Sequence, residues 1–403
     1  MRQDGTTNPS TPRDRARSWI LGLTRYSTAS DHNAPGAQRL ADVRDRLSKL
    51  TGDEAQDVID FLDELLQTEN LEGDKRMRTL DLLRKTVKST RIVPKRLLLS
   101  DVELNLDRFN PLAVTSEFSG IFRGKYNNRD ARAGDFIVSA NFIVHDNILP
   151  FYGLSEVKDG LGLAMVSKWM EQGDLTTCLK NKPQTPRTPL IMDIISGLDH
   201  LHGMNILHTN LKGSNVLISD DERALLADFF QFHLEDNTST SAQPTLAANW
   251  TAPEIAIAED GPPSAASHLL LATGFIPFYE HNGAKLYLAM ISGQIPSLRV
   301  PIIVHDQSNE AALSAKIQTL LSSCWKYTPT ERPSAAEIKD FISELDYMDN
   351  RAPLQNAHST DTGNPQTSSS AVIDYNHVYN IFLQVGLDAF VLLIASSLNL
   401  IQA

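Results

Sequence analysis

The feature that most constrains this chain is a set of short polar motifs that follow one another in a fixed order. His208 to Asn215 reads His-Thr-Asn-Leu-Lys-Gly-Ser-Asn, and Asp228-Phe229-Phe230 follows it. Ala252-Pro253-Glu254 and then Arg332-Pro333-Ser334 come later. A single motif of this length is weak support, but several in one order across residues 94–345 indicate one particular fold.

These motifs resemble the core of protein kinases, which carry His-Arg-Asp-Leu-x-x-x-Asn and Asp-Phe-Gly in the same order. Asn147 to Gly153 resembles the entry to the fourth kinase strand, and Met165 to Leu175 resembles the fifth strand, the hinge and the next helix. Cys324-Trp325, with Arg332, resembles a late helix of the second lobe. The resemblance is closest to tyrosine-kinase-like domains that are expanded in some fungi. It implies an α+β, two-lobed protein-kinase-like fold.

The central motif departs from the kinase pattern at the residue that performs the chemistry. In kinases the Asp of this motif accepts the proton of the substrate hydroxyl. Asn210 stands at that position, and an amide accepts no proton at neutral pH and carries no charge. The resemblance assigns Lys212 to the transferring phosphate, and Asn215 and Asp228 to Mg²⁺. Phe230 replaces the Gly of Asp-Phe-Gly, so this turn loses conformational freedom.

The phosphate-binding loop lacks the glycines that the resemblance calls for. Kinases need glycine there because the backbone must approach the phosphates closely. Val114, Ser116 and Ser119 stand at the three aligned positions. Their side chains are expected to hinder that approach.

The Lys–Glu ion pair that positions the phosphates in kinases has no counterpart here. Residues 126–157 contain no Lys, and residues 118–155 contain no Glu. The stretch 121–147 is also too short for a strand, its connections and a three-turn helix. We therefore expect a truncated N-lobe, in which the third strand and the regulatory helix αC are shortened. Arg129 or Arg132 is the alternative phosphate partner.

A core helix of the second lobe, αF, is shortened as well. After Glu254, the segment from Ala265 to Thr273 provides only about two and a half turns of the long buried helix that kinases have there. His268 stands near the place of the Asp that opens this helix. Because the helix is central to the core of the lobe, we expect its truncation to lower stability.

The resemblance also indicates where a nucleotide would bind. Ile121 and Leu217 would sandwich the base, Ser167 would be the gatekeeper, and backbone groups of Met170 would read the edge of the base. The alternative is that these side chains only pack in the core. The sequence therefore establishes no cofactor, and ATP with Mg²⁺ is the candidate that the resemblance supplies.

Composition restricts the cellular compartment and the kind of partner that we expect for this chain. The net charge of −12 argues against general nucleic-acid binding. The two cysteines, Cys178 and Cys324, lie far apart and outside any metal-binding spacing, which fits a reducing compartment. Residues 1–17 are polar and charged, unlike a signal peptide. We expect a cytoplasmic protein whose partner is a protein that the sequence does not name.

The sequence ahead of residue 94 divides into two segments. Residues 1–36 have no apolar period and are expected to be disordered. Residues 37–93 predict a small helical module, in which Thr51 to Glu54 form a capping box before apolar residues at helical spacing. This module also carries many basic residues, which indicate either a surface for a partner or membrane, or an ordinary solvated helix face.

The sequence beyond residue 345 predicts a flexible linker over residues 346–377 and an apolar tail over residues 378–403. The tail contains Gln384, Asp388 and Asn399, and no Lys or Arg follows Arg351. A membrane anchor needs about 20 mainly apolar residues. The tail is therefore interpreted as a helix packed on the protein or a peripheral helix, with a tail anchor as the alternative.

Three functional hypotheses follow from these departures. The first is a catalytically inactive pseudokinase that acts as a binding or scaffolding module, because separate parts of one mechanism are damaged. The second is a weakly active, ATP-dependent protein kinase, because Lys212, Asn215 and Asp228 are kept. The third is a degraded or mis-assembled gene product, because both shortened segments are core elements.

Overall fold

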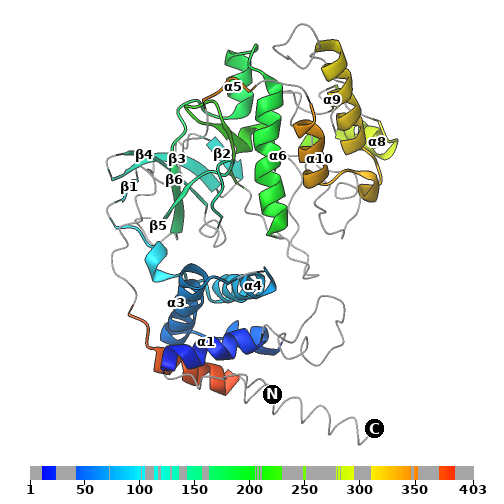
Figure 1. The fold of residues 1–403 in the computed structure, drawn as a ribbon. Coiled ribbons are helices and arrows are strands. Elements are labelled where there is room, and N and C mark those ends of the chain that lie inside the picture. Colours follow the sequence, from blue (N-terminus) through cyan, green and yellow to red (C-terminus); the bar gives the residue numbers. More distant parts are fainter. Residues whose placement is uncertain are drawn as a thin grey trace, which may run out of the picture. The chain divides into compact units, whose positions relative to one another are not determined.

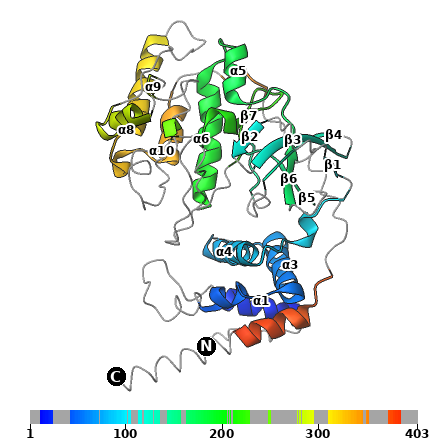
Figure 2. The same ribbon diagram turned by 180° about the vertical axis from the view of Figure 1, so that it is seen from behind.

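The chain divides into two compact units in the computed structural model. The helical unit comprises residues 1–103, 153–164 and 364–403, and the central unit comprises residues 104–152 and 165–363. Figures 1 and 2 show the fold from opposite sides. Within these ranges the described residues are 11–23, 42–71, 73–100, 102–104, 113–116, 119–127, 129–135, 143–156, 163–204, 206, 208, 211–228, 248–250, 278, 280–281, 283–294, 310–345, 349–352 and 372–385.

The helical unit is built on two amphipathic helices, α3 (Gly52–Thr68) and α4 (Gly73–Thr90). Their apolar side chains recur at helical spacing and are buried, as the sequence predicts. The buried residues include Val58, Phe61, Leu62, Leu80 and Leu83. The unit further contains helix α1 (Pro12–Leu23), helical residues 42–47 and 375–385, and the 3-10 helix η1 (Lys95–Leu97).

The start of α3 corrects the predicted capping box. Thr51 is the N-cap residue, but its hydroxyl makes no capping hydrogen bond among the described residues. Gly52 follows with a φ of +56°, in the left-handed region that glycine tolerates best. The capping box, which requires the Thr51 hydroxyl to accept from a first-turn amide, is therefore not formed.

Helix α1 lies inside the segment 1–36 that the sequence predicted to be disordered, and the prediction is wrong for this helix, while residues 1–10 and 24–36 lie outside the described residues. Ala16 and Ile20 are fully buried on one side of this helix. On another side, Arg13 Nε lies 2.7 Å from Glu64 Oε1 of α3, and Arg17 pairs with Glu69 at 2.9 Å. A local pattern does not indicate this helix, because the carboxylates that pair with Arg13 and Arg17 lie far along the chain.

Residues 375–385 form a helix that belongs to the helical unit, where the sequence predicted a linker up to residue 377. Val378, Ile381, Phe382 and Val385 are buried, and Figures 1 and 2 both show this helix beside α1. Residues 378–385, the first part of the predicted tail, are thus part of a helix packed within the helical unit. Among the described residues, no helix is long and apolar enough to cross a membrane, and residues 386–403 lie outside them.

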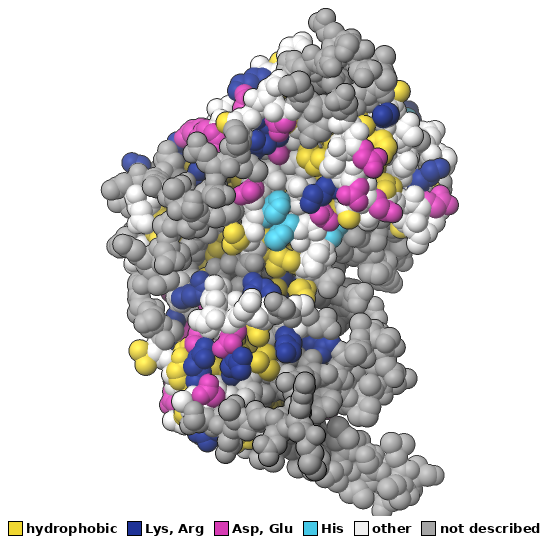
Figure 3. Space-filling view, in the orientation of Figure 1, with side chains coloured by type: hydrophobic (Ala, Val, Ile, Leu, Met, Phe, Trp, Pro, Cys, Tyr) yellow, Lys and Arg dark blue, Asp and Glu magenta, His cyan; other side chains and the backbone are white. Residues whose placement is uncertain are grey.

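Several basic residues of the helical unit form ion pairs within the unit. Arg96 forms an ion pair with the buried carboxylate of Asp63, and its Nη2 lies 3.0 Å from Asp63 Oδ1. Arg44 pairs with Asp81 of α4. On the face seen in Figure 3, basic and acidic side chains of this unit are interspersed. The arrangement favours an ordinary solvated face over a dedicated basic surface.

The strands β1 to β6 form one six-stranded sheet, and β7 and β8 form a separate two-stranded hairpin. The strand order is β1-β3-β4-β6-β5, and β2 pairs with β3. β3 is antiparallel to both β2 and β4, with Arg123 opposite Arg132. The bounds are β1 (Val102–Leu104), β2 (Ala113–Ser116), β3 (Ser119–Tyr126), β4 (Arg129–Asp135), β5 (Phe151–Glu156), β6 (Leu163–Lys168), β7 (Val216–Ile218) and β8 (Ala224–Leu226).

Helices pack around an apolar core in the central unit. Ile195, Leu198 and Leu201 of α6 meet Val216 and other residues of the β7–β8 hairpin there, which gives the α+β architecture that the sequence predicts. The bounds are α5 (Leu175–Asn181), α6 (Arg187–Gly203), α8 (Gly283–Ile291), α9 (Glu310–Cys324), α10 (Ala335–Ser343) and the 3-10 helices η3 (Gly213–Asn215), η4 (Ala248–Trp250) and η7 (Pro329–Glu331).

Residues 349–352 correct the prediction that a flexible linker begins at residue 346. Arg351 reaches the buried Asp193 of α6, with Nη1 2.6 Å from Asp193 Oδ2. This part of the presumed linker is therefore fixed to the central unit. The Ala252–Glu254 motif and the Ala265–Thr273 segment lie outside the described residues.

Candidate functional site

The β7–β8 hairpin brings two predicted metal ligands to one end. Val216 pairs with Leu226, and the ladder continues because the Ala227 amide donates to the Asn215 carbonyl at 2.8 Å. Asn215 precedes β7 and Asp228 follows Ala227, so both leave the ladder at the same end. Asp228 has a φ of +55°, which is uncommon for a residue with a side chain. The backbone therefore turns sharply at the residue that would face a metal ion.

The hairpin is fixed from its other edge by the segment before β5. The Leu149 amide donates to the Leu226 carbonyl, and the Leu226 amide donates to the Asn147 carbonyl, both at 2.9 Å. The side-chain amide of Asn147 donates to the Ala224 carbonyl at 3.2 Å. Because the whole length of β8 is hydrogen-bonded on both edges, its end at Asp228 has little freedom to shift.

The loop before β7 positions Lys212. The Asn215 amide donates to the Lys212 carbonyl at 2.9 Å and closes the short helix η3. Gly213 packs against α5 so closely that a Cβ there would collide with the Thr176 hydroxyl. Lys212 is half-buried and His208 is fully buried. Asn210 lies outside the described residues, so its placement rests on the sequence.

The residues predicted to hold a base are only partly brought together. Met170 and Leu217 meet in a small apolar cluster with Leu149, Leu225 and Ala227. Ile121 of β3 is half-buried and is not in that cluster, as far as the described residues show. The Met170 carbonyl already accepts a hydrogen bond from the Gly173 amide at 3.1 Å.

Ser167 lies at the end of β6, and its side chain is almost completely buried. Within the part of the chain that the structure describes, its hydroxyl has no hydrogen-bond partner. A buried hydroxyl without a partner is unfavourable. A ligand or water that accepts from this hydroxyl would relieve that cost, which fits a gatekeeper position beside Met170.

The structure adds one residue that sequence reasoning missed. Arg123 of β3 forms an ion pair with Glu171 at 2.6 Å, and its guanidinium lies 4.7 Å from the centre of the Trp169 ring. These contacts join β3 to the segment that contains Met170. Nothing local in the sequence signals the pairing, because it joins residues far apart along the chain.

The metal-ligand chemistry fits Mg²⁺ only in part. The side-chain oxygens of Asn215 and Asp228 are the hard donors that Mg²⁺ prefers. Among the described residues, no group of three or more His, Cys, Asp or Glu side chains is placed to hold a metal ion. A magnesium ion at this end of the hairpin would therefore depend on phosphate oxygens of a nucleotide for further ligands.

Comparison with known sequences identifies the class of protein. The family model described as protein kinase domain matches residues 135–341, just over half of the chain. The chain therefore belongs to the protein kinase family. The match begins at the last residue of β4, so β1, β2 and β3 lie ahead of it.

Individual relatives are distant. Serine/threonine-protein kinase fray1 of Dictyostelium discoideum is 24% identical over 208 residues, which cover 48% of this chain and 35% of that protein. Serine/threonine-protein kinase 12 of Arabidopsis thaliana is 28% identical over a region that covers 51% of this chain and 46% of that kinase. Serine/threonine/tyrosine-protein kinase HT1 of the same plant is 25% identical over a region that covers 51% of this chain and 52% of that kinase. The chain thus spans about a third to a half of these relatives.

Proposed function

We propose that this chain is a catalytically inactive member of the protein kinase family that acts as a binding or scaffolding module. Asn210, at the position of the proton-accepting Asp, carries the proposal. A positioned general base typically contributes about 10²–10⁴-fold to a rate. An uncharged amide supplies neither proton acceptance nor the electrostatic attraction that orients the hydroxyl.

Further departures remove phosphate positioning as well. The β2–β3 hairpin has Ser116 opposite Ser119 near its turn, where the resemblance calls for glycine. Val114 stands at the third glycine position. Phe230 replaces the glycine after Asp228-Phe229, although its placement lies outside the described residues. Positioning and charge stabilisation are separate contributions to phosphoryl transfer, and both are weakened.

We further propose that the N-lobe is shortened between its third strand and β5. Residues 126–157 contain no Lys and residues 118–155 contain no Glu, so the usual phosphate-positioning ion pair has no members. The described residues 143–150, which precede β5, contain no helix. The same proposal covers the shortened αF and the placement among tyrosine-kinase-like domains of fungal type, which rest on the sequence motifs.

A weakly active kinase is the second candidate. It is favoured by the retention of Lys212, Asn215 and Asp228, the last two of which leave the hairpin at the same end. The relatives are named serine/threonine kinases. For this candidate the substrate is therefore a protein hydroxyl, and the phosphoryl donor is ATP. A degraded gene product is a weaker candidate, since a continuous buried core is typical of a chain that folds.

The deciding experiment measures transfer of labelled phosphate from ATP by the full chain, with Mg²⁺ and with Mn²⁺. We expect no transfer, and we expect Asn210→Asp not to restore it because phosphate positioning is also missing. Asp221, exposed in the turn of the same hairpin, provides the matched control for Asp228. Transfer that Asp228→Ala abolishes and Asp221→Ala leaves intact would establish the weakly active kinase instead.

Thermal unfolding of the full chain with ATP and Mg²⁺ separates two forms of the inactive protein. Nucleotide at 100 times its Kd stabilises a fold by about 2.7 kcal/mol, which shifts the melting temperature measurably. A shift would identify a nucleotide-binding pseudokinase, and its absence would identify a module that binds proteins alone. Absence of any cooperative transition would favour the degraded product. A cytoplasmic location and a protein partner belong to the same proposal.

A further inference from the structure

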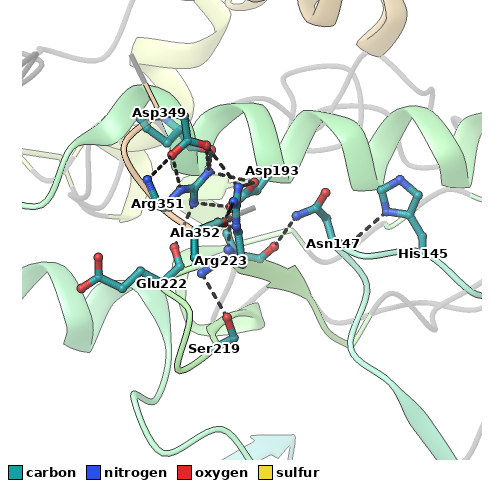
Figure 4. A network of polar contacts seen from close by, with 11 residues as sticks. His145, Asn147, Asp193, Ser219, Glu222, Arg223, Asp349, Arg351 and Ala352 are labelled. Atoms are coloured by element: carbon teal, nitrogen blue, oxygen red, sulfur yellow. Dashed lines mark hydrogen bonds and ion pairs between the residues drawn. The ribbon is translucent and has the colours of Figure 1, made fainter. Parts of the chain in front are cut away.

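A buried carboxylate on α6, that of Asp193, is the centre of a polar network around the start of β8 (Figure 4). Asp193 is 5% exposed. Its Oδ2 accepts the Ala224 amide at 2.9 Å, and Ala224 is the first residue of β8. Asp193 therefore fixes the start of the strand that leads to Asp228.

The cation that balances Asp193 comes from beyond the matched kinase domain. Arg351 donates from Nη1 to Asp193 Oδ2 at 2.6 Å and from Nη2 to Asp193 Oδ1 at 3.1 Å. It also donates to the Pro189 carbonyl at 3.2 Å and the Glu222 carbonyl at 2.9 Å. One side chain thus bonds to α6 and to the turn before β8 together.

The neighbours of Arg351 close the network. Asp349 Oδ2 accepts from Arg351 Nη2 at 2.9 Å and from Arg223 Nη1 at 3.1 Å. Arg223 Nη2 donates to the Ala352 carbonyl at 2.6 Å. The Arg351 side chain is 12% exposed, so these contacts are shielded from solvent far better than a typical surface ion pair.

The charges in this network depend on one another. Burial raises the pKa of Asp193, and the hydrogen bond and charge of Arg351 oppose that rise. Hydrogen bonding to Arg351 lowers the pKa of Asp349 to about 2. Removing Arg351 would leave Asp193 as a buried carboxylate with its principal cation missing, which is strongly unfavourable. Arg223, 3.7 Å from Asp193, is too distant to replace its hydrogen bonds.

We propose that residues 349–352 form a C-terminal latch that positions β8, and through β8 the Asp228 end of the candidate site. The Ala224 amide is held by Asp193, which the latch neutralises, and the Ala224 carbonyl is held by Asn147. The strand then continues through Ala227 to Asp228. The family match ends at residue 341. Because the latch belongs to the folded domain, that domain extends at least to Ala352.

The test is amide hydrogen exchange on the full chain, read at the β8 amides of Ala224, Leu226 and Ala227. Arg351→Ala should accelerate their exchange about tenfold or more, because hydrogen bonds to a charged partner are lost. Arg351→Lys should give an intermediate acceleration, since it keeps the charge but not the two-pronged geometry. The α3 amides, in the other unit, serve as the internal reference.

Lys339→Ala is the matched control, since it removes the ion pair between α10 and Asp199 of α6 at a half-exposed site. It should leave β8 exchange unchanged. The latch is overturned if Arg351→Ala and Lys339→Ala give the same β8 exchange.

A second variant keeps the proposal testable if Arg351→Ala unfolds the whole unit. Asp193→Asn removes the buried charge and keeps an oxygen that accepts the Ala224 amide. In this background, Arg351→Ala should accelerate β8 exchange at least about threefold less than in the native chain, because the ion pair with Asp193 is already absent and only the bonds of Arg351 to its other partners, such as the Glu222 carbonyl, are lost. An undiminished effect of Arg351→Ala in this background would show that Arg351 does not act through Asp193, and would reject the proposal.

Discussion

Phe382→Ala tests whether the 375–385 helix is a structural part of the helical unit. Phe382 is fully buried. Its ring stacks on Trp19 of α1 with the centroids 4.7 Å apart and a 5° interplanar angle, and it lies 5.8 Å from the ring of Phe61 of α3. One side chain therefore joins segments from both ends of the chain to the centre of the module.

The expected loss follows from this burial. Truncating a buried Phe to Ala costs about 3–5 kcal/mol, and an aromatic pair adds about 0.5–1.5 kcal/mol beyond area burial. A terminal helix can partly close over the space, so we expect the low end, about 3 kcal/mol. This corresponds to about a 100-fold increase in local opening. Leu383, the next residue, is 38% exposed, and Leu383→Ala should change stability by less than about 0.5 kcal/mol.

The assay is hydrogen exchange of the full chain, followed in peptides from residues 12–23 and 375–385, with α10 as the reference in the other unit. Phe382→Ala should accelerate exchange in both segments, and Leu383→Ala should do so in neither. The reasoning is refuted if residues 12–23 keep their protection in Phe382→Ala, because α1 would then not depend on this ring.

Two further predictions concern packing and pH. Gly197→Ala should destabilise the chain by about 1–2 kcal/mol in denaturant unfolding, because the new Cβ would lie 2.9 Å from the Asn147 carbonyl oxygen. The overpacking cost exceeds the gain in helix propensity. Gly203→Ala is the control and should be neutral or stabilising, because there is open space around Gly203. Hydrogen bonding to Asp57 raises the pKa of His377. The contribution of His377 to stability is therefore fully present below about pH 6.5 and is lost as the pH rises through the raised pKa. His377→Gln should therefore lower the melting temperature in acid and not in alkali, and an equal deficit at both would contradict this assignment.

Local patterns in the sequence were sufficient for part of this structure. The apolar spacing of α3 and α4 predicted which side chains are buried, because a helix face is set by neighbours three and four residues away. The motif from His208 to Asn215, followed by Asp228-Phe229-Phe230, allowed Asn215 and Asp228 to be aligned with kinase motifs. The prediction that Asn210 makes the protein inactive stays a prediction, since its placement lies outside the described residues.

Long-range charge pairing accounts for what the sequence could not reveal. The first segment has no apolar period and resembled a disordered one, yet Arg13 and Arg17 pair with Glu64 in α3 and Glu69 at its C-terminal end. Arg351 likewise stood in a polar stretch that resembled a linker, and its partner Asp193 is 158 residues away. A local pattern contains the charge and not its partner, so it assigns such residues to solvent.

The position of the 375–385 helix gives the chain the topology of an inserted domain. The central unit starts and ends within the sequence of the helical unit, so both of its ends are attached to one folded body. A released 375–385 helix therefore stays covalently attached to the chain that binds it, and its return is an intramolecular event at an effective concentration that the connection sets. A competing helix from another molecule must exceed that concentration or bind more tightly. Exchange of this helix between two copies, as in a swapped dimer, keeps every contact and is the form of association that this topology most readily permits.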